Sequence, residues 1–286
     1  MGKKPLSSLN VSDPGPRRFC PTWRTFRQVT SASGPDLPKP TVERGAAHTV
    51  ETAPTGRIFR TGRRVSIDDA SPTGRMEYDA IARFLQDAGN DDTDDAGLHE
   101  FGLAWVARRA LFEVRSAPTA REFLEIATWC SGTGRRWAER STQLRGDAGG
   151  HVDASVVWIH LDPETGRPTR WGDGFADNYL EATQGRQIDA KLRHTTSVPE
   201  EATVQPWRFR ATDMDAFGHV NNAAYLSLAE EVWGATTLNE PARVEIEWRK
   251  PSRASEDLAL CVADSQLWLV EPSSELLRVT ITCTPL

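Results

Sequence analysis

The sequence lacks any hydrophobic run long enough to cross a bilayer, and its start lacks the apolar stretch of a secretory signal. Its longest apolar runs, such as VVWI at 156–159, are far too short for a membrane span. Hydrophobic residues make up only 38% of the 286 residues, but ten Trp and ten Phe supply enough aromatic mass for a core. We therefore expect a cytoplasmic protein with no membrane span, folded as one large domain or two small ones.

Cysteine is scarce, and the cysteines do not lie at metal-binding spacing. The four thiols are Cys20, Cys130, Cys261 and Cys283, far apart and without a CxxC pair. We expect buried free thiols, no metal and no thiol catalysis. The net charge is −6, and basic residues concentrate in residues 1–56, so the rest of the chain is more acidic still. This distribution argues against a nucleic-acid-binding protein.

The composition and the hydrophobic periodicity of the sequence change near residue 57. Residues 1–56 are rich in Pro, Ser, Gly, Thr and Arg without sustained periodicity, which predicts a disordered or linker arm. Two patterned units follow, at 57–171 and 204–286, and an irregular polar linker at 172–203 separates them.

Each unit begins with a strand-like run and a helix and continues with several strands. In the first unit, apolar residues at helical spacing over 74–91 predict an amphipathic helix with one buried face. A second helix is predicted after the Asn pair at 221–222. Strands are predicted at 103–115, 122–132, 135–145 and 151–162, and again at 242–251, 256–266, 267–274 and 275–285.

The two units align with each other as an internal repeat. GRMEYDAIARFLQD (74–87) falls on GHVNNAAYLSLAEE (218–231) without gaps, and Pro118 falls on Pro251. A long helix before a series of antiparallel strands can bury its apolar stripe only against the sheet. The repeat therefore predicts an α+β fold of two such units packed as a pseudo-dimer.

The densest chemical stretch is DMDAFGHVNNAAYLSLAEE at 213–231. Gly218 permits a tight turn, and Asn221 or Asn222 can cap the helix that follows. Backbone amides at such a helix start are donors for an oxyanion. The candidates for that role are the amides around Gly218 and Val220, with Asn221 and Asn222.

Three side chains in this stretch are catalytic candidates. Asp215 could attack a carbonyl or act as a general base on water, and His219 could orient the carboxylate, bind the carbonyl or move a proton. Glu231 lies three turns further along the helix. Ordinary helix capping would also explain an Asp and an Asn pair. The first repeat copy has Arg75 opposite His219, so the fold does not require the histidine, which favours catalysis.

The pattern D-x-D-x-x-G-H-V-N-N-x-x-Y at 213–225 resembles hotdog-fold thioesterases, and the two-unit layout resembles plant and bacterial acyl-acyl-carrier-protein (acyl-ACP) thioesterases. The Thr128–Trp129 pair of the first unit is similar as well. The resemblance implies tandem hotdog domains that hydrolyse fatty acyl-ACP to a free fatty acid, in fatty acid biosynthesis, without a cofactor. It places the family's catalytic Asp, His and Glu on Asp215, His219 and Glu231.

Two positions depart from that family pattern. Phe217 stands where the plant proteins have an Asn, and Arg249–Lys250 stand near the plant Glu-Cys pair. A mechanism that needs that Asn or Cys is therefore not available to this chain. Asp215 is the favoured reactive carboxylate, with backbone amides holding the oxyanion and His219 assisting.

An acidic carrier protein as partner would need a locally basic docking face. Candidates are Arg135, Arg136, Arg249 and Lys250, with Arg140, Arg145 and Arg253 as further possibilities, although ordinary solvated charges explain each equally well. Phe84, Trp105 and Trp129 are candidates for an acyl slot in the first unit, and core packing is the alternative for them. A homodimer of such two-unit chains is also possible.

Three other functions remain open from the sequence. An acyl-CoA thioesterase would use the same chemistry on another carrier. A hotdog dehydratase would need a His and an acid on opposite units, whereas His219 and Glu231 share one helix. A non-catalytic acyl-binding protein is the third, because Phe217 replaces a polar residue.

Overall fold

The computed structural model describes residues 55–98, 105–234 and 236–286, all within one compact unit that begins at Ala47. The arm predicted at 1–56 therefore lies almost wholly outside the described residues, as does Cys20. In the described part, every helix is too short or too polar to cross a membrane.

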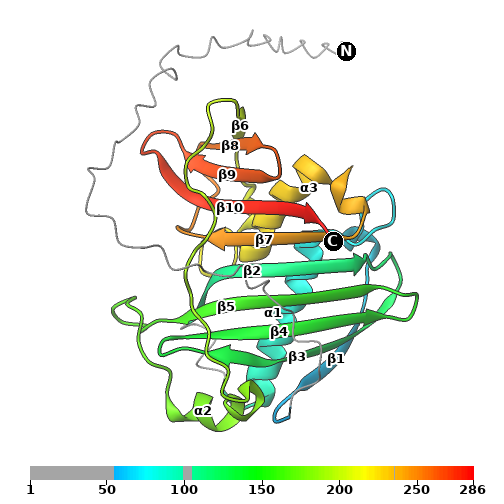
Figure 1. Ribbon diagram of the computed structural model, residues 1–286, viewed down its shortest axis with the longest axis vertical. Helices are drawn as coiled ribbons and strands as arrows, with labels where there is room; N and C mark the ends of the chain where they lie inside the picture. Colours follow the sequence, from blue (N-terminus) through cyan, green and yellow to red (C-terminus); the bar gives the residue numbers. More distant parts are fainter. Residues whose placement is uncertain (1–54, 99–104, 235) are drawn as a thin grey trace, which may run out of the picture. The chain divides into compact units, whose positions relative to one another are not determined.

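A single ten-stranded antiparallel sheet forms the frame of the molecule (Figure 1). The strands are β1 (Phe59–Arg64), β2 (Trp105–Ser116), β3 (Phe123–Thr133), β4 (Trp137–Gly146), β5 (His151–His160), β6 (Thr203–Trp207), β7 (Ala242–Trp248), β8 (Leu258–Ala263), β9 (Gln266–Glu271) and β10 (Leu276–Pro285). Their order across the sheet is β1-β3-β4-β5-β2-β7-β10-β9-β8-β6. Each half of this order is the mirror of the other about the β2–β7 pair.

The β2–β7 pair joins the two units edge to edge. It runs antiparallel from Arg109 opposite Glu247 to Val114 opposite Ala242. Buried residues alternate with half-buried ones along most of β7, whereas β2 is buried without interruption from Ala110 to Val114. The predicted α+β architecture of tandem hotdog units packed as a pseudo-dimer is thus confirmed.

The helices of the two units differ in length. Helix α1 (Tyr78–Asp95) buries Ile81, Phe84 and Ala88 against the sheet, as the periodicity predicted, and continues further through an acidic last turn. Its counterpart is a 3₁₀ segment, η6 (Asn222–Leu226), followed by the short α3 (Ser227–Trp233). The Asn221 side chain caps η6 by accepting the Ala223 N–H at 2.9 Å.

The repeat extends upstream of the helices into matching turns. A short 3₁₀ helix precedes each turn, η2 (Ile67–Asp69) in the first unit and η5 (Ala211–Asp213) in the second. A single bridge then closes each turn, between Ala70 and Met76 and between Met214 and Val220. Gly74 and Gly218 have φ angles of 83° and 75°, a left-handed conformation that favours glycine. The two turns therefore share one backbone path.

The segment between the units first passes the end of α1, where the Tyr179 hydroxyl lies 3.5 Å from the Asp92 carbonyl oxygen, and then crosses the outer face of the sheet (Figure 1). It contains α2 (Asp173–Tyr179) and a 3₁₀ turn, η4 (Glu181–Thr183), and then runs without regular structure to β6. Arg109 donates to the Asp189 carbonyl at 2.9 Å, and Trp268 donates to the Thr195 carbonyl at 2.9 Å. The segment thus contacts strands of both units.

Candidate active site

Asp215 and His219 lie on one tight turn between η5 and η6. The Asp215 N–H donates to the His219 carbonyl at 2.8 Å, and the Gly218 N–H donates back to the Asp215 carbonyl at 3.1 Å. Asp215 Oδ1 also accepts the N–H of Phe217 at 2.9 Å and that of His219 at 3.2 Å. Both Asp215 and His219 are half-buried, so each side chain is held in place and still reaches solvent.

Three of the four amides predicted to hold an oxyanion already have acceptors. Gly218 donates within the turn, Val220 donates to the Ser252 carbonyl at 3.0 Å, and Asn221 donates to the Asp213 carbonyl at 2.9 Å. That part of the prediction is wrong, because the turn and its bridge use these donors for their own backbone pairing. No group in the described part of the chain accepts the Asn222 N–H, which therefore remains the available donor.

Tyr225 and Ser252 support the turn from beneath. The Tyr225 hydroxyl accepts the Ser252 N–H at 2.8 Å, and Ser252 in turn holds Val220. Burial raises the pKa of Tyr225, so the hydroxyl stays protonated at neutral pH. The loop after β7 is thereby fixed against the catalytic candidates.

Phe217 extends from the same turn into solvent, with 63% of its surface exposed. Its side chain cannot hydrogen-bond, and its backbone N–H is used by Asp215. In the first repeat copy, Thr73 holds this position and its hydroxyl pairs with that of Ser71 at 2.8 Å. Phe217 therefore contributes no polar group to the turn.

The carboxylate predicted on the helix is not at the site. Glu231 is exposed and does not line the cavity described below, because its position faces away from α1. Its neighbour Glu230 is the one that is largely buried, with 13% of its side chain exposed. Glu230 binds Arg75 through both oxygens, at 3.1 Å and 2.6 Å, and accepts the Tyr78 N–H at 2.7 Å. Burial alone would lower the pKa of Arg75, but the charge and hydrogen bonds of Glu230 outweigh it and raise that pKa.

The first repeat copy has the backbone of the catalytic turn without its chemistry. Ser71 replaces Asp215 there: its N–H donates to the Arg75 carbonyl at 2.8 Å, as that of Asp215 does to the carbonyl of His219. Arg75 in turn replaces His219. Because the backbone pairing is retained with other side chains, the turn itself does not require an aspartate and a histidine.

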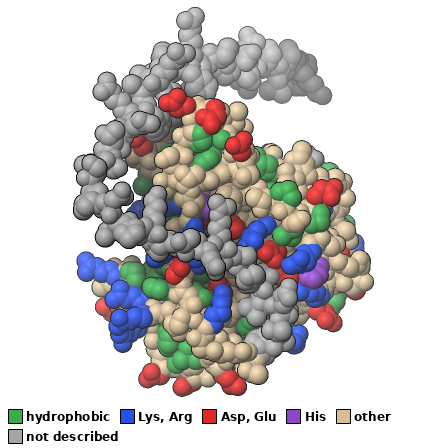
Figure 2. Space-filling model, viewed as in Figure 1, with side chains coloured by type: hydrophobic (Ala, Val, Ile, Leu, Met, Phe, Trp, Pro, Cys, Tyr) green, Lys and Arg blue, Asp and Glu red, His purple; other side chains and the backbone are tan. Residues whose placement is uncertain are grey.

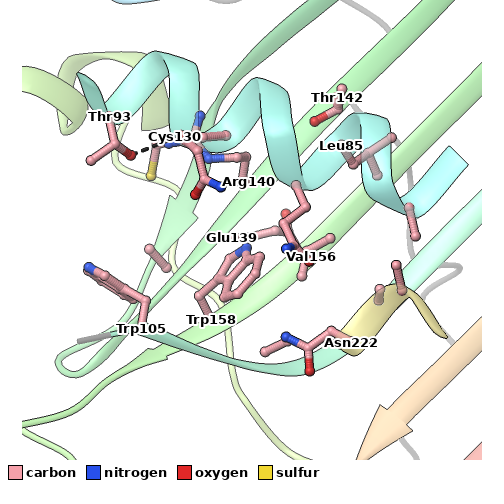
Figure 3. A pocket seen from close by; sticks show the side chains of 18 of the residues that line it. Leu85, Thr93, Trp105, Cys130, Glu139, Arg140, Thr142, Val156, Trp158 and Asn222 are labelled. Carbon is pink, nitrogen blue, oxygen red and sulfur yellow. Dashed lines mark hydrogen bonds between the residues drawn. The ribbon is translucent and has the colours of Figure 1, made fainter. Parts of the chain in front are cut away.

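A cavity of about 130 Å³ lies between α1 and the sheet of the first unit and reaches the start of η6 (Figure 3). Asn222 and Trp105 lie at opposite ends of it, with Trp158 between them beneath α1. Helix α1 lines the cavity with a stripe at helical spacing: Ala82, Leu85, Gln86, Gly89, Asn90 and Thr93. Asp215 and His219 do not line it, but their turn leads directly into Asn222.

The wall of the cavity on β3 and β4 carries polar groups. Arg140 points into it and forms an ion pair with Asp92 of α1 at 2.6 Å, and the Tyr179 ring lies 5.4 Å from its guanidinium carbon. Cys130 lies beside it, and burial raises the pKa of that thiol to about 11. A thiol of such a pKa remains protonated at neutral pH and is a poor nucleophile.

One of the three predicted acyl-slot residues lines the cavity. Trp105 does, stacked between His160 and Phe175 with ring centroids 4.9 Å and 5.2 Å away. Phe84 belongs to the main core instead, and Trp129 packs with Ala182 on the opposite face of the sheet. Both predictions fail for the same reason, since an aromatic residue in an apolar run can face either side of its element.

The predicted docking residues have different surroundings. Arg135, Arg136 and Lys250 are exposed, whereas Arg249 binds the buried Glu247 at 2.8 Å. Arg140 is in the cavity, so it cannot be a docking residue. Figure 2 shows basic side chains gathered at the left edge of the visible face, beside the green loops of the first unit in Figure 1.

Sequence reasoning missed Gln86, Asn90 and Arg140 as cavity residues and Glu230 as a buried partner of the first unit. The helical stripe of small and polar residues along α1 was the available signal, because such residues leave room beside a helix. The residues that the structure describes contain no group of three or more His, Cys, Asp or Glu side chains that could hold a metal ion. The arrangement offers a carboxylate, an imidazole and a free amide beside an elongated cavity.

Comparisons with known proteins identify the two units. A family model described as the acyl-ACP thioesterase N-terminal domain matches residues 56–179, and one described as the acyl-ACP thioesterase C-terminal domain matches residues 196–276. An uncharacterized protein of Mycobacterium tuberculosis is 29% identical over 213 residues, which cover 74% of this chain and 84% of that protein.

Two further relatives carry functional names. The chloroplastic oleoyl-acyl carrier protein thioesterase 1 of Arabidopsis thaliana is 25% identical over 170 residues, which cover 52% of this chain and 47% of that protein. The structure of an oleoyl thioesterase (putative) from Lactobacillus plantarum has a TM-score of 0.66 at 17% identity, and covers 80% of this chain and 96% of the other. The structural likeness supports the same double-unit fold.

Proposed function

Because the chain belongs to the acyl-ACP thioesterase family and is a thioester hydrolase, we propose that it releases free fatty acids from fatty acyl-ACP in fatty acid biosynthesis. The observation that carries this proposal is the cavity that begins at Asn222, directly after the Asp215–His219 turn. An acyl chain in the cavity would leave its thioester at that turn. A carrier protein outside would hold the other end of the thioester.

In the proposed reaction, Asp215 takes a proton from water, and the resulting hydroxide attacks the thioester carbon. The Asn222 N–H holds the oxygen that becomes negatively charged. The tetrahedral intermediate collapses, the C–S bond breaks, and the thiolate takes a proton relayed from Asp215 or through His219. The products are a carboxylic acid and the free thiol of the carrier arm, so every atom of water and thioester is accounted for.

A direct attack by Asp215 on the carbon is the alternative, with a mixed anhydride that water then opens. A single turnover in water enriched in ¹⁸O detects the anhydride route if water opens the anhydride at its aspartyl carbon. The general-base route puts the label only in the fatty acid, whereas opening of an anhydride at its aspartyl carbon leaves label in Asp215. Mass spectrometry of the peptide that contains residue 215 reads out the difference.

The activity is tested on matched acyl-ACP and acyl-CoA substrates across a series of chain lengths. The proposal expects a higher kcat/KM on the carrier protein than on CoA at the best chain length. A clear preference for CoA would instead make the chain an acyl-CoA thioesterase. Binding without turnover on either carrier would favour an acyl-binding protein and would contradict hydrolysis.

A further inference from the structure

Each unit places the middle of its helix beside the start of the helix of the other unit. Helix α1 packs against both η6 and α3. We call the two places where the middle of one helix meets the start of the other the first and second crossings. At the first crossing, the start of α1, Glu230 of the second unit accepts the Tyr78 N–H and binds Arg75. The first crossing is therefore closed by a carboxylate from the opposite unit.

The repeat defines what stands at the other crossing. The gapless alignment of 74–87 on 218–231 equates Tyr78 with Asn222, Arg75 with His219 and Gln86 with Glu230. The matching turns and bridges show that the same register holds in the structure. Gln86 of α1 is thus expected to face the start of η6, and Gln86 and Asn222 do line the same cavity.

The second crossing is open where the first is closed. The half-buried Gln86 side chain makes no hydrogen bond to any other residue that the structure describes, and the Asn222 N–H also has no acceptor there. In this structure the neutral Gln86 carboxamide does not accept the Asn222 N–H, whereas the Glu230 carboxylate accepts that of Tyr78. The carboxamide leaves the position of an anionic oxygen beside the Asn222 N–H vacant, and it adds a second donor next to that position.

We propose that Gln86 is a catalytic residue that donates its Nε2–H to the thioester carbonyl oxygen beside the Asn222 N–H. The active site then consists of Asp215 and His219 from the second unit and Gln86 from the first. This role rests on the proposed hydrolysis of acyl thioesters. Both donors gain strength as the oxygen becomes negative in the tetrahedral state, so they favour the transition state over the bound substrate.

Two substitutions test this role by steady-state kinetics on acyl-ACP. For Gln86→Ala we expect kcat to fall roughly 10²- to 10³-fold with little change in KM, as for loss of one oxyanion donor. For Gln86→Glu we expect a larger loss, because the new carboxylate would accept the Asn222 N–H as Glu230 accepts that of Tyr78. Gln205→Glu, the same chemical change on the exposed edge strand β6, should keep wild-type kinetics.

A second measurement does not depend on turnover. In Gln86→Glu, NMR titration should show a higher pKa for the His219 imidazole, since an anion would lie beside it as Glu230 lies beside Arg75. Gln86→Ala should show no such rise. A kcat of Gln86→Ala within threefold of wild type, or an unchanged His219 titration in folded Gln86→Glu, would overturn the assignment.

The two proposals fail in different ways. If the wild-type chain hydrolyses no acyl thioester, the proposed function is wrong and the donor role of Gln86 falls with it, whatever His219 shows. If the wild type is active and Gln86→Ala is equally active, hydrolysis stands and Gln86 is only a wall of the cavity. Thermal unfolding of each variant shows that any loss arises in the folded protein.

Discussion

Arg75 and Glu230 form a bidentate ion pair that joins the turn before α1 of the first unit to the helix of the second unit. Their nitrogen–oxygen distances are 3.1 Å and 2.6 Å, and the side chains are 7% and 13% exposed. The pair occupies the place that corresponds, in the second repeat copy, to His219 and Gln86. One copy of the repeat thus has an ion pair at this place, and the other has open polar groups.

Removal of one member of this pair should destabilise the fold. Arg75→Ala leaves the buried Glu230 carboxylate with a backbone N–H as its remaining partner, and breaking a buried pair in this way costs about 3 to 5 kcal/mol. Glu230→Gln should cost less, because its amide oxygen can still accept the Tyr78 N–H. Urea denaturation measures both. Equal stability of Arg75→Ala and wild type would show that the pair contributes nothing to folding.

The fold followed from the sequence because the repeat and the periodicity agreed. The helix at 74–91 and the strands of both units were predicted close to their observed bounds, and a helix before a meander can pack only on the sheet. The second helix was predicted as one long α-helix, but it begins as the 3₁₀ segment η6. Local hydrogen bonding around the Asn221 cap sets that start, and periodicity does not report it.

The site was harder to predict because it depends on contacts between distant segments. Asp215 and His219 share a turn of five residues, so their proximity could be read directly from the sequence. Which amides remain free depends on Ser252 and Asp213, and the spacing of the motif says nothing of those acceptors. Glu231 was predicted from its place three turns along the helix and from the family resemblance, but its neighbour Glu230 faces the first unit, because one residue along a helix turns a side chain by about 100°.

Asp215→Asn should abolish most hydrolysis and leave the fold intact. The amide oxygen of Asn can still accept the N–H groups of Phe217 and His219, so the turn keeps its hydrogen bonds. Asn cannot take a proton from water, and loss of a general base costs roughly 10²- to 10⁴-fold in kcat. A thioester hydrolysis assay and thermal unfolding measure the two effects.

Glu231→Gln is the matched control for that experiment, since it removes an exposed carboxylate from the same segment. We expect its kcat to stay near wild type. Substantial activity in Asp215→Asn, or its loss in Glu231→Gln, would move the reactive carboxylate to another residue.

Trp105 and Trp129 should respond differently to truncation, because only Trp105 lines the cavity. Trp105→Ala removes the side chain at the end away from Asn222, so longer acyl chains should be accepted. Trp129→Phe should lower the urea midpoint without altering chain-length preference, since that ring packs on the opposite face. A chain-length series for both variants decides the matter, and a shifted preference in Trp129→Phe would contradict this assignment of faces.

Docking of an acidic carrier should depend most on the loop after β7. Ser252 of that loop pairs with Val220, so the exposed Lys250 and Arg253 lie close to the catalytic turn. Arg135 and Arg136 precede β4, which is separated from β7 by β5 and β2. Lys250→Glu and Arg253→Glu should each lower kcat/KM on acyl-ACP roughly fivefold, which corresponds to about 1 kcal/mol. The decrease should be smaller at high salt, because salt screens exposed charges.

Arg121→Glu is the control for this effect, because Arg121 is an exposed arginine in the corresponding loop of the first unit. The turn beside that loop lacks the aspartate and histidine, so we expect its kcat/KM to be unchanged. A smaller effect of Lys250→Glu than of Arg135→Glu would place the carrier over the β3–β4 hairpin instead.

The free energy of unfolding should fall in mildly acidic solution because of His194. This residue of the segment between the units forms hydrogen bonds with strands β7 and β10 of the sheet. Its Nδ1 lies 3.0 Å from the Thr280 hydroxyl, and its backbone N–H donates to the buried Glu247 at 3.2 Å. Burial lowers the pKa of His194 more than the nearby Glu247 and Glu245 raise it, and Arg249 lowers it further. The pKa of His194 is therefore higher in the unfolded chain than in the folded one. As the pH falls, the imidazole takes up a proton first in the unfolded chain.

It follows that the free energy of unfolding includes a contribution from neutral His194 that is complete above the usual histidine pKa of about 6.5 and declines as pH falls below it. His194→Asn keeps a hydrogen-bonding group near the position of Nδ1 but cannot take up a proton. Urea denaturation between pH 7.5 and 5.5 should show a shallower decline for this variant than for wild type. Parallel declines in the two proteins would assign the acid sensitivity to other groups.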